Sequence, residues 1–467
     1  MRRITGTHVY SYVKCPQLAA LDLHLSRSER RPAHPWEEFA AQRGRDFEAT
    51  FVRDLGVVSP EYPERDFEAG SAATLALLRA GAPWIHQAVL MVGDRLGLPD
   101  LLRRLPGPSE LGDWHYEVID VKTSGRPRGE QILQVVFYTD LLAAVQGRMP
   151  EHGALVLKDG REERFAIADY AAAGAEVLAE LRALRDEPAR ARPFLQAACS
   201  GCYHDRRCLD AMTAAGDLSL VQGMSHGARA ILEQVGCRTV QDLATFHADG
   251  ARARGNLDSA LVRRLVRAAH AHLLGEVLVE ERPRAARGGA EAVVHLLTDP
   301  YADRLLAFGV LDPAAPGSTF RCVLPATAAD EWPAVSGLLA SLPRNATILH
   351  FGEALPRWLE AHALHEDADR TLDGRLVDLK KRLRGAATFP RAVFGLHDFV
   401  QFGLRRDPLR AGSPGEAAMW MSLPDGQDRL RRKLEQDLHD LVDLQAAVLH
   451  AVPSPPVAAA AAAPPPG

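Results

Sequence analysis

The chain has 467 residues, of which 47% are hydrophobic and 25% charged, a composition typical of a globular protein with more than one domain. Its 55 Lys and Arg against 60 Asp and Glu give a formal net charge of −5, which excludes an overall basic coat for nucleic acid but not a local basic groove. No stretch approaches the roughly 18 apolar residues of a membrane helix, the N-terminus lacks the apolar segment of a secretory signal, and no Lys follows a Gly as in a Walker A loop. We therefore expect a cytoplasmic protein with no membrane partner and no P-loop motor of its own.

Four regions differ in composition and pattern. Residues 1–212 mix helical patterns with short β-rich runs and end in a Cys-rich segment, which predicts one α/β domain. Residues 213–280 are typical of short helices interrupted by Gly. Residues 290–450 begin with strand patterns and continue as helices, which predicts a second α/β domain. The Pro/Ala-rich residues 451–467 have the composition of a disordered tail.

Acidic residues and a lysine recur in the first region at spacings that suit metal chemistry. The run YEVIDVKTS predicts a strand, and its period of two places Asp120 and Lys122 on one face. Asp100 follows a Gly-Leu-Pro bend about twenty residues upstream. Carboxylates are hard ligands for Mg²⁺ or Mn²⁺, and a neighbouring ammonium can orient or deprotonate water and offset charge at phosphorus. An Asp-x-Lys pair alone also fits a solvated strand edge with a surface ion pair.

Two helical segments add polar residues to this set. Glu48, in RGRDFE, is a further candidate ligand, and Gln134 and Tyr138 lie at i and i+4 on one helix face. Four motifs therefore follow in order: G-x-x-x-E (Gly44 to Glu48), G-x-x-D (Gly97 to Asp100), D-x-K (Asp120 and Lys122) and Q-x-x-x-Y (Gln134 to Tyr138).

This order of motifs resembles the RecB-like branch of the PD-(D/E)XK nucleases, whose fold is a mixed central sheet flanked by helices. The resemblance implies that Asp100 and Asp120 hold metal, that Glu48 completes the site, and that Lys122 is the catalytic lysine. It also implies that Gln134 and Tyr138 lie beside the site and touch DNA. Many RecB-like members carry His where this chain has Glu48, and either residue can ligate a divalent metal.

Three cysteines within ten residues form C-x2-C-x5-C, namely Cys199, Cys202 and Cys208. In a reducing compartment this spacing favours a soft-metal site over disulfides, and Cys15 is the natural candidate for a fourth ligand. One upstream and three downstream cysteines also resemble the iron–sulfur RecB-like exonucleases, including the CRISPR-associated ones and the AddB-type nuclease domains. The resemblance implies a structural [4Fe-4S] cluster. Zinc, with His204 as a spare ligand, is the alternative, and Cys237 and Cys322 are expected in the core.

Residues 217–250 resemble the helix–hairpin–helix units that bind the DNA backbone without sequence preference. Gly223 and Gly236 stand where hairpins would expose backbone N–H groups to phosphates. A phosphate-tracking surface is compatible with five nearby arginines: Arg252, Arg254, Arg263, Arg264 and Arg267. A plain helical connector fits the same pattern.

Residues 290–450 resemble the RNase H-like domain that follows the nuclease domain in one bacterial family of RecB-like nucleases. DEDD exonucleases begin this domain with D-x-E on a strand and use two later Asp, all to hold two metals. The matching positions here are His295, Leu297, Asp378 and Asp440. Because Leu297 cannot ligate metal, we expect a catalytically inactive binding or structural platform. The alternative is that Asp299 or Asp303 replaces the lost ligands.

Together these features predict a Mg²⁺- or Mn²⁺-dependent DNA nuclease, an exonuclease acting on single strands or ends, with a structural iron–sulfur cluster. DNA repair and a helicase partner are expected from the family resemblance alone. The alternative function is a non-catalytic nucleic-acid-binding subunit of a repair or processing complex.

Overall fold

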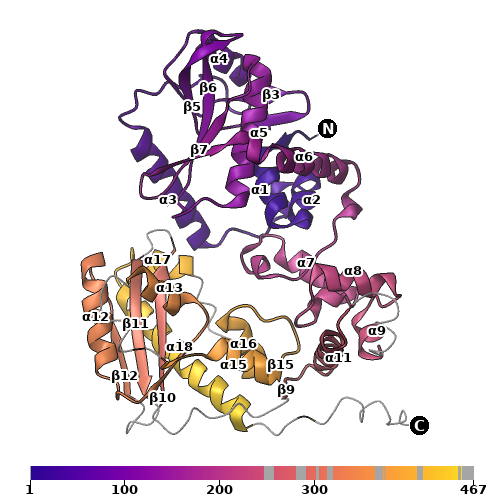
Figure 1. Ribbon diagram of the computed structural model, residues 1–467, viewed down its shortest axis with the longest axis vertical. Coiled ribbons are helices and arrows are strands. Elements are labelled where there is room, and N and C mark those ends of the chain that lie inside the picture. The colour runs from indigo at the N-terminus through magenta and orange to yellow at the C-terminus, as the bar shows by residue number, and fades with distance from the viewer. Residues whose placement is uncertain are drawn as a thin grey trace. The chain divides into compact units, whose positions relative to one another are not determined.

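The computed structural model of the chain describes residues 2–246, 257–279, 291–300, 304–312, 319–362, 372, 374–406, 414–450 and 454. The chain divides into two compact units, Met1–Pro193 with Gly201–His204, and Phe194–Ser200 with Asp205–Gly467. Each unit combines helices with a mixed β-sheet, which confirms the predicted α/β class (Figure 1). Within the described ranges, every helix is too short or too polar to cross a membrane.

The first unit is built on a five-stranded sheet with the order β2-β5-β6-β7-β8. Its strands are β2 (Trp84–His86), β5 (Leu101–Ser109), β6 (Gly112–Val121), β7 (His152–Val156) and β8 (Glu162–Ala166). Strand β6 pairs antiparallel with β5 and parallel with β7, so the sheet is mixed. A smaller sheet with the order β1-β4-β3 contains β1 (Ile4–Thr5), β4 (Arg95–Gly97) and β3 (Leu90–Val92).

Helices cover both faces of the larger sheet. These are α1 (Gly6–Lys14), α2 (Pro16–His24), α3 (Pro35–Val52), α4 (Phe67–Arg79), α5 (Gly129–Gln146) and α6 (Ala171–Asp186). Figure 1 shows α3 and α5 on opposite sides of β5, β6 and β7.

Strand β6 is buried on both faces, and this decides where its polar residues point. Val118 packs with α1 and α5 in the main core, whereas Ile119 packs with α3 in a second core. Because side chains alternate along a strand, Asp120 lies on the same face as Val118, beneath α1 and α5.

The second unit contains a five-stranded sheet with the order β12-β11-β10-β13-β14. The strands are β10 (Glu291–Asp299), β11 (Arg304–Asp312), β12 (Thr319–Val323), β13 (Thr347–His350) and β14 (Leu376–Asp378). Strand β11 pairs antiparallel with both β10 and β12. On the other side of β10, β13 pairs parallel with β10, and β14 pairs parallel with β13.

Two hydrophobic cores sandwich this second sheet. One face packs on α12 (Ala328–Ala340) and α13 (Ala354–Ala361), and the other packs on α15 (Leu379–Ala386), α16 (Leu396–Gly403) and α18 (Gly426–His450). Helix α18 buries apolar residues at helical spacing: Leu434, Leu438, Leu441, Leu444 and Val448. A short helix, α17 (Pro414–Trp420), also packs on β10.

The remaining described helices of the second unit are α7 (Asp205–Ala214), α8 (His226–Gln234), α9 (Val240–Ala244) and α11 (Ser259–Leu274). Helices α8, α9 and α11 share a core of their own. Two strands, β9 (Leu278–Val279) and β15 (Ala387–Thr388), pair antiparallel. The predicted disordered tail, apart from residue 454, lies outside the described residues.

Candidate active site

The Asp120 and Lys122 side chains lie together at the end of β6. The Lys122 Nζ atom is 2.5 Å from Asp120 Oδ2, and the Lys122 N–H extends the pairing with β7 by donating to Val156 O at 2.8 Å. The expected shared strand face is therefore present. The Asp120 side chain is only 2% exposed, and its Oδ2 contacts the Lys122 ammonium.

Asp100 enters the same site from the start of β5. In the antiparallel register Leu101 faces Ile119, which brings the preceding Asp100 next to the end of β6. Asp100 Oδ2 accepts the Val121 N–H at 2.8 Å and lies 4.0 Å from Lys122 Nζ. The Asp100 N–H in turn donates to Asp120 Oδ1 at 3.4 Å. Two carboxylates and one ammonium thus share one small volume.

Glu48 projects from α3 and is held by two residues that sequence reasoning did not single out. Its Oε1 accepts from His86 Nε2 at 2.9 Å and from Gln87 Nε2 at 2.5 Å. The hydrogen bond from His86 lowers the pKa of Glu48 below its ordinary value, while the Asp120 charge acts in the opposite direction. In the sequence, the feature that could have pointed to these two partners of Glu48 is the pair of polar residues, His86 and Gln87, within the otherwise apolar run WIHQAV.

Burial and charge shape the protonation of this site. Burial and the neighbouring Asp120 carboxylate raise the pKa of Asp100 well above its ordinary value. Burial alone would lower the pKa of Lys122, but the carboxylates of Asp120 and Asp100 outweigh it and raise that pKa. Lys122 is therefore an ammonium at neutral pH, able to donate hydrogen bonds but not to accept a proton.

The residue types fit a divalent cation. Among the described residues, no group of three or more His, Cys, Asp or Glu is gathered as a metal centre. The buried Asp120 Oδ2, whose contact is the Lys122 ammonium, and the adjacent Asp100 Oδ2 are nevertheless hard ligands of the kind that Mg²⁺ and Mn²⁺ take. A bound cation would also remove the mutual repulsion that raises the pKa of Asp100.

Gln134 and Tyr138 lie on α5 beside these carboxylates. Gln134 Nε2 donates to the Tyr138 hydroxyl at 3.0 Å, so the predicted i, i+4 pair shares a face and a hydrogen bond. Burial and the charges of Asp120 and Asp100 raise the pKa of Tyr138 well above its ordinary value, which keeps it a phenol. Gly6 and Gly97 both pack on the ring so closely that an added Cβ would lie 2.4 Å and 2.9 Å from Tyr138 atoms.

The four cysteines expected to bind a cluster divide between the two units. Cys15 and Cys202 belong to the first unit, and Cys199 and Cys208 to the second. All four are half-buried. Cys202 Sγ accepts the His204 N–H at 3.4 Å, which is the kind of contact that supports a metal-bound thiolate. The cluster stays a prediction.

The spare zinc ligand, His204, is buried within the first unit. Its Nε2 lies 3.6 Å from Asp22 Oδ1, and its ring meets Tyr203 edge-on. The two other cysteines were expected in the core: Cys237 is buried there, whereas Cys322 is half-buried against the core of the second sheet.

The candidate residues of the second unit have separate partners. His295 Nε2 lies 3.6 Å from Asp437 Oδ2 on α18, whereas Asp378 Oδ1 caps α15 by accepting the Lys380 N–H at 2.9 Å. Asp440 accepts from Gln436 Nε2 at 2.9 Å. Within the described contacts, no hydrogen bond or ion pair joins Asp378 to His295 or to Asp440.

The other positions in this expected DEDD-like site add no gathered ligands. Leu297 is half-buried on β10, and Asp299 is buried at the end of the same strand. Asp303 lies outside the described residues. Catalytic inactivity of this half stays a prediction.

In the hairpin between α8 and α9, three backbone N–H groups donate hydrogen bonds to acceptors within the same segment. The Gly236 N–H donates to Glu233 O at 3.1 Å, and the N–H groups of Arg238 and Thr239 donate to Asp242 Oδ2 at 3.0 and 2.9 Å. These three donors are therefore not directed at a phosphate.

Of the five arginines noted in the sequence, Arg263 and Arg264 are exposed on α11, and Arg267 Nη2 donates to Val279 O. Arg252 and Arg254 lie outside the described residues. The hairpin glycine Gly223 adopts a positive φ of 84°, as its place in a turn requires.

Comparison with known proteins adds no family to these observations. No protein-family model matches the chain, and no curated protein matches it. The functional argument therefore depends on the geometry described above.

Proposed function

We propose that the chain is a divalent-metal-dependent nuclease that hydrolyses phosphodiester bonds of DNA, acting on single strands or ends, at Asp100, Asp120 and Lys122. The observation that carries the proposal is the Lys122 Nζ atom 2.5 Å from one carboxylate and 4.0 Å from the other. The mixed sheet with helices on both faces also supports it, because this is the architecture implied by the RecB-like resemblance.

Asp100 and Asp120 would hold Mg²⁺ or Mn²⁺, with Glu48 as the third carboxylate. The cation would supply positive charge to the phosphorane and acidify its water. The Lys122 ammonium, fixed by Asp120, donates hydrogen bonds to the attacking water and to the phosphate oxygens on which charge grows. His86 and Gln87 hold Glu48 ionised and oriented. The Tyr138 phenol, whose oxygen accepts from Gln134, keeps its own proton to donate to the strand.

The remaining parts of the proposal concern the accessory elements. Cys15, Cys199, Cys202 and Cys208 would hold a [4Fe-4S] cluster that folds the cysteine segment, with zinc as the alternative. Iron and sulfide in protein purified anaerobically, together with a brown colour, would support the cluster, and zinc without iron would replace it. The RNase H-like half would serve as a platform for DNA or for a helicase partner.

The test of the active site is cleavage of end-labelled single- and double-stranded DNA, with and without Mn²⁺ or Mg²⁺. We compare the wild type with Asp120→Asn, which removes one ligand charge without changing side-chain size. Asp113→Asn is the matched control, because Asp113 is exposed on the same strand. Metal-dependent cutting that only Asp120→Asn abolishes supports the nuclease. Salt-sensitive DNA binding without cutting by any of the proteins points to the alternative, a non-catalytic binding subunit.

A further inference from the structure

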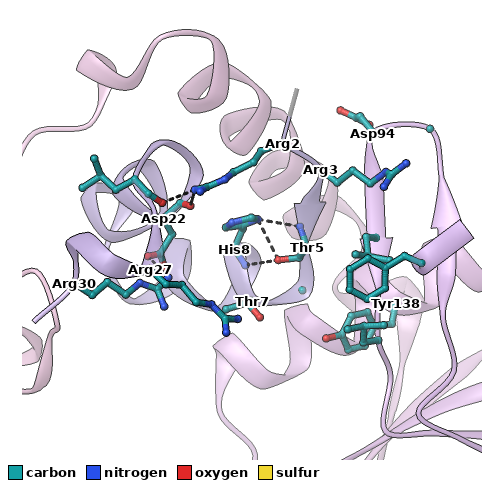
Figure 2. A pocket seen from close by; sticks show the side chains of 16 residues that line it. Arg2, Arg3, Thr5, Thr7, His8, Asp22, Arg27, Arg30, Asp94 and Tyr138 are labelled. Atoms are coloured by element: carbon teal, nitrogen blue, oxygen red, sulfur yellow. Dashed lines mark hydrogen bonds and ion pairs between the residues drawn. The ribbon is translucent and has the colours of Figure 1, made fainter. Parts of the chain in front are cut away.

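A pocket of about 890 Å³ opens in the first unit at the start of α1. Its walls come from the first thirty residues, from Phe67 on α4, from β4 with the turn before it and Leu98 after it, and from Tyr138 on α5. Four arginines line it: Arg2, Arg3, Arg27 and Arg30. Figure 2 shows Arg2, Arg27 and Arg30 gathered on one side and Arg3 with Tyr138 on the other.

Both carboxylates that line the pocket form ion pairs with arginines. Asp22 pairs with Arg30 at 2.6 Å, and Asp94 pairs with Arg182 and Arg185, which stand outside the lining, at 2.9 and 2.7 Å. The lining therefore has an excess of positive charge, although the whole chain is acidic.

The other three arginines are not tied to buried acids. Arg2 donates to the carbonyl oxygens of Asp22 and Leu25, and among the described residues it forms no ion pair with a carboxylate. Arg3 pairs with Glu68, whose side chain is 70% exposed, and such a pair is weak in water. Across the part of the chain that is described, the Arg27 side chain makes no hydrogen bond or ion pair.

This pocket adjoins the candidate active site at Tyr138 and along the short stretch of chain from Leu98 to Asp100. Tyr138 forms part of its wall and, through its hydrogen bond to Gln134, belongs to the α5 face beside the carboxylates. Leu96 and Leu98 line the pocket as well, and the chain reaches Asp100 only two residues after Leu98. Tyr138 therefore borders both the pocket and the two carboxylates.

We infer that this pocket binds the phosphodiester backbone of a single DNA strand whose scissile bond lies at Asp100, Asp120 and Lys122. Arginine guanidinium groups match phosphate oxygens in charge and geometry, and the apolar side chains of Leu25, Phe67 and Leu98 suit sugars and bases. The inference rests on the proposed function for the identity of the strand.

The test measures strand binding without hydrolysis. A fluorescein-labelled single-stranded oligothymidylate is titrated with protein in EDTA, and its anisotropy is followed at several salt concentrations. The variants are Arg27→Gln, Arg3→Gln and the pair combined. Neither arginine has a buried partner, so these variants are expected to fold. Arg79→Gln, an exposed arginine at the far end of α4, is the matched control.

Each pocket arginine that contacts a phosphate contributes about 0.7 to the slope of log K against log salt for a single strand. We expect each single variant to lower the slope by about 0.7 and to weaken binding about tenfold, and the double variant to lower the slope by about 1.4. Arg79→Gln should match the wild type. Thymidine monophosphate at millimolar concentration should not displace the strand, and a labelled duplex should bind without dependence on the pocket arginines.

The outcomes separate this inference from the proposed function. If the chain cuts DNA with metal but the double variant binds the strand as the wild type does, the pocket inference is wrong and the nuclease stands. If binding depends on the two arginines but no metal supports cutting, the pocket inference holds for a binding protein and the nuclease is wrong. Displacement by the mononucleotide would overturn the inference in favour of a nucleotide site, and duplex binding that depends on the arginines would overturn the single-strand assignment.

Discussion

Removing the Lys122 ammonium while keeping the bulk of its side chain, as in Lys122→Met, should destabilise the first unit. The Asp120 side chain is 2% exposed and its Oδ2 faces Lys122 at 2.5 Å, so the variant leaves a buried carboxylate without its counter-charge. Breaking a buried pair from one side costs about 3–5 kcal/mol. Because Lys122 is itself 21% exposed, we expect a loss of about 3 kcal/mol, at the lower end of that range. The exposed pair Arg3–Glu68 should contribute at most about 1 kcal/mol.

Hydrogen exchange in EDTA, followed on peptides from β6 and α5, measures the loss of stability of Lys122→Met. Because these peptides belong to the first unit, the second unit does not contribute to the result. Asp120→Asn combined with Lys122→Met should recover about 2 kcal/mol of this loss, since the buried charge is gone. Lowering the pH should also restore stability to Lys122→Met, because the unpaired carboxyl binds a proton in the folded state. A loss below about 1 kcal/mol, the value of an exposed pair, would refute the reasoning.

Three further predictions concern the site's protonation and hydrogen bonds. Because the pKa of Asp100 is raised, the metal-free protein should lose stability as the pH rises through that pKa, and Mn²⁺ binding at a pH below it should release a proton. Calorimetry in buffers of different ionisation enthalpy measures this proton release. If the Asp100→Asn variant still released the proton, the assignment to Asp100 would be contradicted. His86→Ala removes the hydrogen bond that lowers the pKa of Glu48, so the acidic limb of the pH–rate profile should move to higher pH, and an unmoved limb would show that Glu48 has no part in turnover. Tyr138→Phe should raise KM about fivefold, the cost of one lost hydrogen bond, at unchanged melting temperature, whereas a lower melting temperature with the same KM would make Tyr138 a packing residue only.

The sequence predicts those parts of the site that depend on the periodicity of a single strand or helix. Asp120 and Lys122 share a strand face because side chains alternate, and Gln134 meets Tyr138 because four residues make about one helical turn. Both relations need only the secondary structure to be right. The α/β class followed from the same kind of pattern.

Contacts that depend on tertiary packing were not predictable. His86 and Gln87 hold Glu48 from across 38 and 39 residues, and nothing in the local sequence fixes that distance. The arginine pocket likewise joins the first thirty residues to β4 and α5. At the hairpin before α9, the Asp242 carboxylate accepts the N–H groups of Arg238 and Thr239, a local contact that the spacing of the glycines did not predict.

The most direct test of the central claim is the rate at which Lys122→Ala cuts an end-labelled single strand in Mn²⁺, beside the wild type and Lys381→Ala. Lys381 is a suitable control because its side chain is 75% exposed in the second unit. We expect wild-type cutting to require the metal, Lys381→Ala to match it, and Lys122→Ala to lose at least about a hundredfold in rate, the typical cost of one electrostatic group at the transition state. Cutting that persists in Lys122→Ala would contradict the assignment of this site and would direct the search to the second unit.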